Sequence, residues 1–396
     1  MKTSRYSNTR QKSCQQCSDA KARCDRERAR CARCVQRGLA CAYPQVTSQS
    51  SDLSSGASIP SPPSDFSADT SAGQAKASQP VEDEADTHRS LDFTSLRLVC
   101  PIDAERIRNR WLNPYLEQPD QVVKAYPPMI TRFISRMLGS YAAVAAHGRS
   151  APPFIHPAQM HAPGAPLATC LSLVRVSDDP LLPGSVGNAA LILQREMDAI
   201  AAQGQDEGGG FDDAATALDA FQAYLIYVLV LFFRLNQGSR PFFRNAMTTL
   251  QGLACVAAQT GLVCATDAAH ARPRWEEWIV AEAKRRSLYV MYLLDSVLSG
   301  QENLPTYLGT ELRGLPAPSS KTLWQAPTRA AWEQEYNIFL AEWSEPHLTI
   351  DELWPTPLEM DHVSAARRRS RVDRWLQALD EFGTMLFAVT DCTHGA

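Results

Sequence analysis

The sequence lacks the short motifs of several large enzyme classes. It contains no G-x-x-x-x-G-K-[ST], no G-x-G-x-x-G and no H-E-x-x-H, which argues against the common phosphate-binding loops and the zinc-protease helix. Long hydrophobic runs are also missing. The main apolar run, residues 223–233, has eleven residues, which is too short to span a bilayer and is typical of a buried core helix. We therefore expect neither an enzyme nor a membrane protein.

A hydrophobic leader is absent as well. Residues 1–13 are polar and basic, and no apolar stretch among them would form a signal peptide or a membrane anchor. We expect the chain to remain in the cytosol and nucleus, where cysteine thiols stay reduced.

A cysteine repeat with the spacing C-x2-C-x6-C-x6-C-x2-C-x6-C lies near the N-terminus. Its members form two halves with a period of seventeen residues: Cys14, Cys17, Cys24, Cys31, Cys34 and Cys41. Zinc prefers four tetrahedral ligands and binds thiolates well. Six thiolates are too many for one zinc, and they complete two zinc sites only if two sulfurs bridge both ions. In each half, Cys-x2-Cys can place both sulfurs on the first turn of a short helix.

Other uses of these cysteines fit less well. A disulfide framework requires an oxidising compartment, and no secretory signal precedes the repeat. A single mononuclear zinc site would leave some of the cysteines without a metal. A metallothionein-like metal-storage segment would not need the surrounding arginines. The spacing therefore favours a binuclear zinc cluster.

The charge of the chain is unevenly distributed. Residues 1–45 contain eleven Lys and Arg and three acidic residues, a balance of +8, whereas the whole chain carries −4 and the remainder therefore −12. Six thiolates and two zinc ions leave this head at about +6. A compact, positively charged head suits a polyanion such as nucleic acid. The alternative is a solvated basic tail that serves only nuclear import.

Residues 13–43 resemble the fungal zinc binuclear-cluster (Zn2Cys6) transcription factors, whose family allows the spacing of all six cysteines. The stretch CARCVQRGLACAY is similar to regulators of fungal polyketide gene clusters of the aflatoxin-pathway type. The resemblance implies two zinc ions per chain, with Cys14 and Cys31 as the bridging pair. It also implies double-stranded DNA with CGG triplets as the partner and the nucleus as the location.

The same resemblance identifies candidate DNA contacts. In the family, a lysine four residues after the second cysteine contacts guanine edges in the major groove, which implies this role for Lys21. Arg23 matches a basic position that faces phosphate, and Lys12 and Arg26 are further candidates. Ser18 and Ala20 stand where the family commonly has basic residues, and Ala29 stands where it often has proline. We expect these departures to weaken backbone affinity, and the nearby arginines to compensate: Arg26, Arg28, Arg30 and Arg33.

Residues 46–90 differ abruptly in composition from the head. Serine and proline crowd residues 48–78, an acidic run closes the stretch at residues 82–86, and large apolar side chains are almost absent. Such a segment cannot build a core, and we expect a disordered linker. No a/d heptad run lies between Tyr43 and Leu91, so we expect any homodimer to form through the later helical region or on DNA.

Residues 91–396 are expected to form a large, mostly α regulatory domain. Apolar spacing predicts helices at 128–147, 167–176, 187–202, 212–235, 241–263, 275–298 and 361–388, and a Gly-rich loop at 205–213. The W–WI–E–RR–LLD and LP–LW–A patterns between residues 211 and 343 resemble the helical regulatory domain of the same fungal family.

Most polar groups of this region have structural interpretations. The i, i+3 and i, i+4 spacing of Glu282 to Arg285 and Arg286 favours a helix-packing ion pair over a ligand contact. His156 and His161 lie in a Pro-rich loop and are weak metal candidates. Five arginines of the last predicted helix are expected to form a solvated face, with a second import signal as the alternative: Arg367, Arg368, Arg369, Arg371 and Arg374. The remaining cysteines are expected to be buried apolar side chains: Cys100, Cys170, Cys255, Cys264 and Cys392.

Together these features predict a sequence-specific DNA-binding transcription factor, with the helical domain receiving regulation or contacting the transcription machinery. The resemblance implies a pathway-specific activator of a fungal secondary-metabolite gene cluster. The alternative is a zinc-containing protein-interaction adaptor or corepressor without selective DNA binding, which Ser18 and Ala20 favour.

Overall fold

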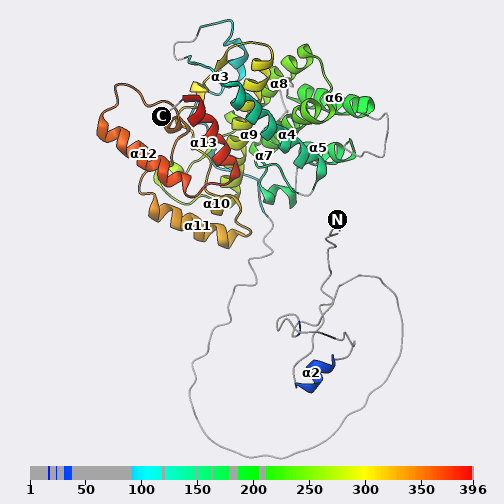
Figure 1. Cartoon of the computed structure of the whole chain (residues 1–396), viewed down its shortest axis with the longest axis vertical. Coiled ribbons are helices and arrows are strands. Elements are labelled where there is room, and N and C mark those ends of the chain that lie inside the picture. Colours follow the sequence, from blue (N-terminus) through cyan, green and yellow to red (C-terminus); the bar gives the residue numbers. More distant parts are fainter. Residues whose placement is uncertain are drawn as a thin grey trace, which may run out of the picture. The chain divides into compact units, whose positions relative to one another are not determined.

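The computed structural model describes residues 17, 24, 31–37, 91–117, 121–148, 150–161, 164–177, 186–204, 211 and 213–394. The chain divides into two compact units, Met1–Gln79 and Pro80–Ala396 (Figure 1). The linker predicted at 46–90 lies outside the described residues, as does most of the loop predicted at 205–213.

The second unit is mostly helical, which confirms the predicted fold class (Figure 1). Its α-helices are α3 (Glu105–Arg108), α4 (Pro128–His147), α5 (Ala165–Ser177), α6 (Val186–Gln203), α7 (Ala214–Val230), α8 (Arg240–Gln259), α9 (Trp275–Gln301), α10 (Lys321–Trp324), α11 (Arg329–Glu342), α12 (His362–Leu376) and α13 (Glu381–His394). Short helical turns are η3 (Asn109–Leu112), η4 (Pro157–His161), the π-helical η5 (Leu231–Leu235), η6 (Asp267–Ala269), η7 (Thr310–Leu312) and η8 (Ile350–Leu353).

Helix α7 lies at the centre of the core, in contact with α4, α5, α6, α8 and α9. The Asp213 carboxylate caps it by accepting hydrogen bonds from two backbone N–H groups of the first turn. Every residue from Ala217 to Val230 is buried. By length and composition, Ala214–Leu235 is apolar enough to cross a membrane, but 78% of its apolar window is buried within the protein. The prediction of a buried core helix is confirmed.

Two antiparallel strand pairs hold the N-terminal segment of the unit against the segments that follow α8 and α9. Strand β1 (Leu98–Val99) pairs with β3 (Val263–Cys264), and β2 (Val123–Lys124) pairs with β4 (Thr306–Tyr307). The first pair corrects the helix predicted at 241–263, because α8 ends at Gln259. Gly261 adopts φ +102°, and a Cβ at this glycine would meet the Leu98 Cβ at 2.3 Å. The chain therefore leaves the helix in order to pair with β1.

Helix α9 carries buried charges through the core. Glu282 accepts hydrogen bonds from Arg285 at 2.6 Å and from Arg286 at 2.8 Å, and all three side chains are at most 4% exposed. Arg286 also reaches Asp380, at 2.5 Å, from a segment 94 residues later. The predicted helix-packing ion pair is confirmed.

The last predicted helix, 361–388, is two helices. Helix α12 ends at Leu376 and α13 begins at Glu381, and Asp380 between them turns inward to Arg286. The Asp380 carboxylate also accepts a hydrogen bond from Gly383 N at 2.8 Å, which caps α13. The Trp375 indole donates to the Pro318 carbonyl at 2.8 Å. A continuous helix would lose these inward contacts.

The arginines of α12 are not a freely solvated face. Arg371 pairs with Glu345 and Glu352, both at 2.8 Å, and Arg367 also pairs with Glu345. Arg368 donates to the backbone carbonyls of Asp351 and Glu352 in η8 and of Trp354 just after it. Arg374 donates to the Glu342 carbonyl. These side chains hold the 342–354 segment against α12. Arg368 and Arg371 are half-buried, so the predicted solvated face is wrong for these two, whereas Arg367, Arg369 and Arg374 are exposed as predicted.

The two loop histidines do not form a metal site among the described residues. His156 is fully buried, with its ring edge-on to those of Trp275, Trp278 and Trp324. Burial lowers the pKa of His156 to about 3. His161 is exposed. The buried cysteines Cys170, Cys255 and Cys264 match their prediction, Cys100 is half-buried, and the Cys392 side chain lies outside the described residues.

Lys284 is a buried amine on the same helix. Its Nζ donates to Thr260 Oγ1 at 2.7 Å and to the Gly261 carbonyl at 3.1 Å. Burial lowers the pKa of Lys284 from 10.5 to about 7, although Asp213 and Cys100 act in the opposite direction. The unfolded chain therefore keeps this proton over a pH range in which the folded chain has released it.

We predict that Lys284 makes stability increase with pH above neutrality. Between pH 7 and 10.5 the unfolded state binds the extra proton, so rising pH favours the folded state, by at most about 1.4 kcal/mol per pH unit. From pH 7 to 9, the free energy of unfolding of the native chain should rise by ~1–2 kcal/mol relative to Lys284→Met, measured by denaturant titration. A difference that stays constant with pH would contradict the lowered pKa, and the exposed Lys321→Met should show no such trend.

Candidate metal centre

Helix α2 (Ala32–Gln36) carries the second Cys-x2-Cys pair. Cys31 occupies the N-cap with φ −67° and ψ 146°, and its carbonyl accepts a hydrogen bond from Val35 N at 3.1 Å. Cys34 follows within the first turn, and both cysteines are fully buried. The predicted placement of Cys-x2-Cys on the first turn of a short helix is confirmed for this half.

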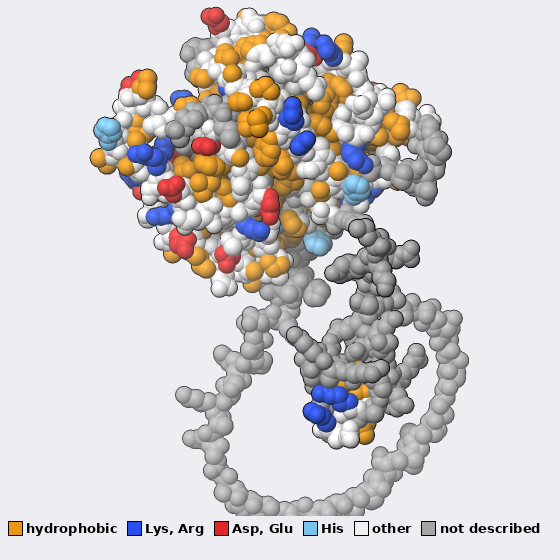
Figure 2. All heavy atoms as spheres, viewed as in Figure 1, with side chains coloured by type: hydrophobic (Ala, Val, Ile, Leu, Met, Phe, Trp, Pro, Cys, Tyr) orange, Lys and Arg blue, Asp and Glu red, His pale blue; other side chains and the backbone are white. Residues whose placement is uncertain are grey.

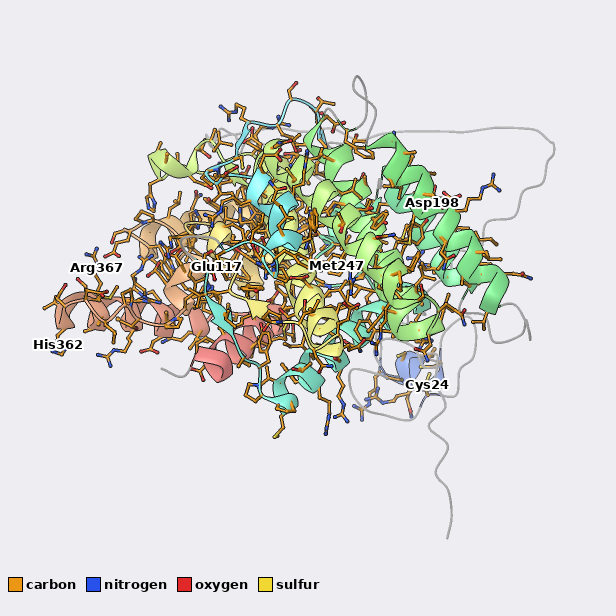
Figure 3. All side chains as sticks on the ribbon, turned by 90° about the horizontal axis from the view of Figure 1, so that it is seen from above. Cys24, Glu117, Asp198, Met247, His362 and Arg367 are labelled. Carbon is orange, nitrogen blue, oxygen red and sulfur yellow. The ribbon has the colours of Figure 1, made fainter. Side chains whose placement is uncertain are left out.

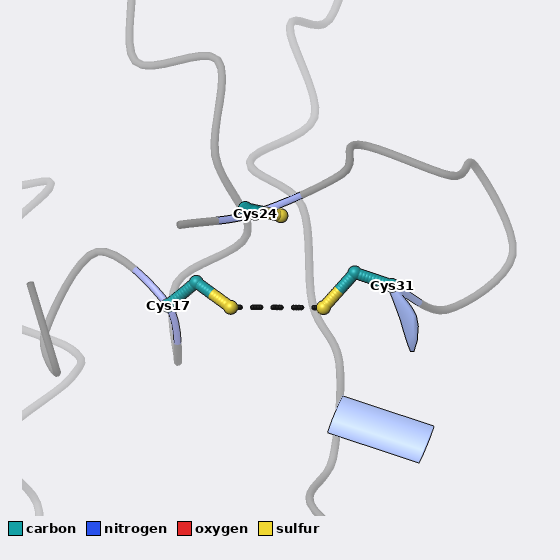
Figure 4. Close-up of side chains that lie close together, drawn as sticks. All are labelled: Cys17, Cys24 and Cys31. Carbon is teal, nitrogen blue, oxygen red and sulfur yellow. Dashed lines mark hydrogen bonds between the residues drawn. The ribbon is translucent and has the colours of Figure 1, made fainter. Parts of the chain in front are cut away.

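Three cysteine sulfurs converge in this unit (Figure 4). The Sγ atoms of Cys17, Cys24 and Cys31 all lie within 4.8 Å of one another, and those of Cys17 and Cys31 are 3.6 Å apart. A disulfide bond would require about 2.05 Å. Two thiolates bound to one tetrahedral zinc at about 2.3 Å lie ~3.8 Å apart. The trio therefore fits three corners of a zinc site.

The trio combines the two halves of the repeat. Cys17 and Cys24 belong to the first half, whereas Cys31 opens the second. Cys31 therefore lies where a ligand shared between the two halves would lie. No other trio of Cys, His, Asp or Glu in the described part of the chain brings its ligand atoms this close.

Arg33 is a neighbour of this centre that sequence reasoning missed. Its Nη1 donates a hydrogen bond to Cys17 Sγ at 3.7 Å, and the side chain is half-buried. A cationic donor offsets thiolate charge and orients the sulfur, as outer-shell partners of metal ligands do. The place of Arg33 in the sequence instead indicates a role in DNA-backbone affinity, together with Arg26, Arg28 and Arg30. No spacing rule links it to a cysteine 16 residues away, so the sequence carried no signal for this contact.

Two arginines of the described residues, Arg33 and Arg37, lie close to the centre along the chain. Arg37 at the end of α2 is exposed, and Figure 2 shows Lys or Arg side chains on the described part of this unit. The other predicted site residues lie outside the described residues: Lys12, Cys14, Lys21, Arg23, Arg26 and Cys41.

Comparison with known families identifies this segment. Residues 12–50, about a tenth of the chain, match the Fungal Zn(2)-Cys(6) binuclear cluster domain. The chain carries a fungal Zn2Cys6 domain. This domain binds two zinc ions, and the sulfur trio fits one of them. It is a domain of DNA-binding transcription factors and not of enzymes, and it implies a nuclear role. No curated protein and no solved structure matches the chain.

In the Zn2Cys6 domain, zinc supplies the cross-links of a core that so short a segment cannot build from apolar side chains. The chain's own residues provide the donors and their setting. Cys17, Cys24 and Cys31 present the sulfurs, α2 fixes the direction of Cys31, and Arg33 offsets the charge on Cys17.

We predict that Arg33→Met weakens zinc retention. Losing an outer-shell donor should lower zinc affinity by about tenfold, measured on the full chain by competition with the chelator 4-(2-pyridylazo)resorcinol. Arg37→Met removes a nearby exposed charge without touching a cysteine, so it should retain zinc as the native chain does. Equal zinc loss from both variants would show that the Arg33–Cys17 contact has no role.

Proposed function

We propose that the protein is a nuclear regulator that binds CGG-containing promoter elements through its Zn2Cys6 domain and activates a fungal secondary-metabolite gene cluster. The convergence of Cys17, Cys24 and Cys31 within a segment of net charge +8 carries the DNA-binding part of this proposal. The similarity of residues 31–43 to polyketide-cluster regulators supports the pathway assignment.

The proposed zinc ligands are all six cysteines of the repeat: Cys14, Cys17, Cys24, Cys31, Cys34 and Cys41. Cys14 and Cys31 are the proposed bridging pair. The position of Cys31 beside Cys17 and Cys24 supports its half of that assignment. Cys34, buried within the first turn of α2, is then available to the second zinc.

Lys21 is the proposed base-reading residue, because its ammonium can donate to the O6 and N7 acceptors of guanine. Arg23, Lys12 and Arg26 are proposed to contact phosphates, which position the domain without reading sequence. Their charge also makes binding depend steeply on salt concentration.

The proposed organisation is a DNA-binding head at 1–45, a disordered linker at 46–90 and a regulatory domain at 91–396. A flexible linker of that length spans about 35–40 Å, which lets the head follow promoter DNA while the regulatory domain contacts the transcription machinery. A homodimer, where one forms, uses the helical domain.

Binding-site selection from random duplexes tests the proposed function. Enrichment of CGG-containing elements supports the regulator. Uniform, weak retention would favour a zinc-containing adaptor or corepressor, the function to which Ser18 and Ala20 point. Genome-wide occupancy then tests the pathway, because binding should concentrate at the promoters of one secondary-metabolite gene cluster.

We predict that Lys21→Ala weakens specific DNA binding by about 1–3 kcal/mol and relaxes the preference for guanine. Gel-shift titrations against specific and scrambled duplexes measure both affinities. Lys76→Ala removes one charge from the proposed linker and serves as the control. An unchanged ratio of specific to non-specific affinity in Lys21→Ala would refute base reading by this residue.

We also predict that chelation separates the two units. Metal binding and folding are coupled in so small a head, so a strong chelator should abolish DNA binding. Helicity comes mostly from the second unit, so the far-UV circular dichroism should remain nearly intact. Simultaneous loss of both signals would contradict independent units.

A further inference from the structure

A cavity of about 600 Å³ lies between α4, α10, the first residues of α13 and the segment that runs from the end of α4 through η4. Hydrophobic side chains gather in Figure 2 on the face where Figure 1 places α4 and α13. The volume is in the range of small-molecule sites. Nothing in the Zn2Cys6 domain accounts for it.

The inner walls of this cavity are mostly apolar. One face of α4 forms one wall, through residues at i, i+4 and i+7 spacing, and α13, α10 and the segment around η4 form the others. The apolar lining includes Met137, Val144, Ile155, Met160, Trp324 and Phe382. A ligand with an apolar body would remove this surface from water.

Tyr141 adds an unpartnered hydroxyl to the α4 wall. The side chain is 6% exposed, and its hydroxyl makes no hydrogen bond with any described residue. It is not among the buried polar atoms that lack both a partner and accessible surface, so it is open to the cavity. Burial raises the pKa of Tyr141 well above its usual range, so the hydroxyl stays protonated. It can therefore donate to an oxygen of a ligand.

Two side chains at the rim can bind an anion. Arg175 and His161 are exposed and line the cavity, and neither makes an ion pair or a hydrogen bond within the part of the chain that the structure describes. The acidic residues of the wall, Asp380 and Glu381, each pair with a cation already. A ligand carboxylate would thus gain a guanidinium without breaking an existing ion pair.

The backbone of α4 sets the separation of these two binding elements. Gly148 ends the helix at φ +67°, and a Cβ there would meet Arg175 Nε at 2.6 Å, so the guanidinium group lies against the last turn. A cation is favourable at this negative end of a helix even before an anion arrives. Tyr141 precedes Gly148 by seven residues, which is about two turns or ~10 Å along the axis.

We propose that this cavity binds an elongated carboxylic acid with an apolar body. Its carboxylate pairs with Arg175 and accepts a hydrogen bond from His161. A second oxygen, about 10 Å away along α4, accepts a hydrogen bond from Tyr141. No cysteine of the zinc centre takes part in this site, which gives the helical unit a ligand-binding role in addition to the proposed function.

Isothermal titration calorimetry of the full, zinc-loaded chain with 4′-acetylbiphenyl-4-carboxylate tests the proposal. This rigid probe carries a carboxylate and a ketone separated by about the same two helical turns. The native chain should bind it about fivefold more tightly than 4′-ethylbiphenyl-4-carboxylate, which lacks the ketone. It should bind the probe about tenfold more tightly than 4-acetyl-4′-methylbiphenyl, which lacks the charge.

Three variants locate the probe. Tyr141→Phe removes only the hydroxyl, so it should abolish the preference for the ketone over the ethyl compound. Arg175→Met should abolish the preference for the acid over the neutral compound. Ser140→Trp places an indole in the cavity from an exposed position and should prevent binding. As the control, Arg369→Met removes an exposed arginine from α12, which Figure 3 shows at the edge of the unit through the label on Arg367, and should bind as the native chain does.

Circular dichroism of each variant confirms that it is folded. Absence of binding, equal affinity for the ketone and the ethyl compound, tighter binding of the neutral compound, or binding unaffected by Arg175→Met would each overturn the proposal. Because Arg175 is exposed, its variant remains informative if Tyr141→Phe fails to fold.

Discussion

The helical unit depends on a neutral cluster of four buried charges. Glu282 and Asp380 face Arg285 and Arg286 at 2.5–2.8 Å. Burial alone would raise the pKa of Glu282, but the two guanidiniums outweigh it and hold that pKa at about 2. Without Asp380, the cluster would retain one uncompensated positive charge, which is among the most costly defects a core can contain. The requirement for neutrality explains why the chain breaks the last predicted helix to turn Asp380 inward, which ties the start of α13 to Arg286 of α9.

The two units are stabilised by different chemistry. In the helical unit, apolar side chains from α4, α5, α7, α8 and α9 form a continuous core, and the buried ions select one packing within it. The Zn2Cys6 segment, residues 12–50, is too short for such a core. There, sulfur atoms brought within 4.8 Å of one another occupy the centre, and metal coordination replaces apolar burial.

Local patterns predicted local structure well. The apolar spacing located α4 at its observed bounds, and the cysteine spacing predicted both the short helix at Cys31 and the convergence of sulfurs. The predictions failed where a residue far away in the sequence determines the local structure. The break before Glu381 depends on Arg286, 94 residues earlier, and the end of α8 depends on Leu98. Arg371 looked solvated because Glu345 and Glu352 come from a segment without periodicity. The contact of Arg33 with Cys17 is of the same kind, since the two residues meet only in the folded chain.

The two halves of helix α9 make ion pairs with different parts of the helical unit. Its N-terminal half carries Glu282, Arg285 and Arg286, whose ion pairs fix the helix against α13 and the segment around Ser319. Its C-terminal end carries Asp295, which pairs with Arg110 of η3, and is followed by Glu302, which pairs with Arg244 of α8. These ion pairs tie η3 and α8 to α9 in addition to the apolar core that α8 and α9 share. Charged side chains therefore fix α9 to its neighbours at both ends, whereas apolar packing alone would leave its rotation and register less well defined.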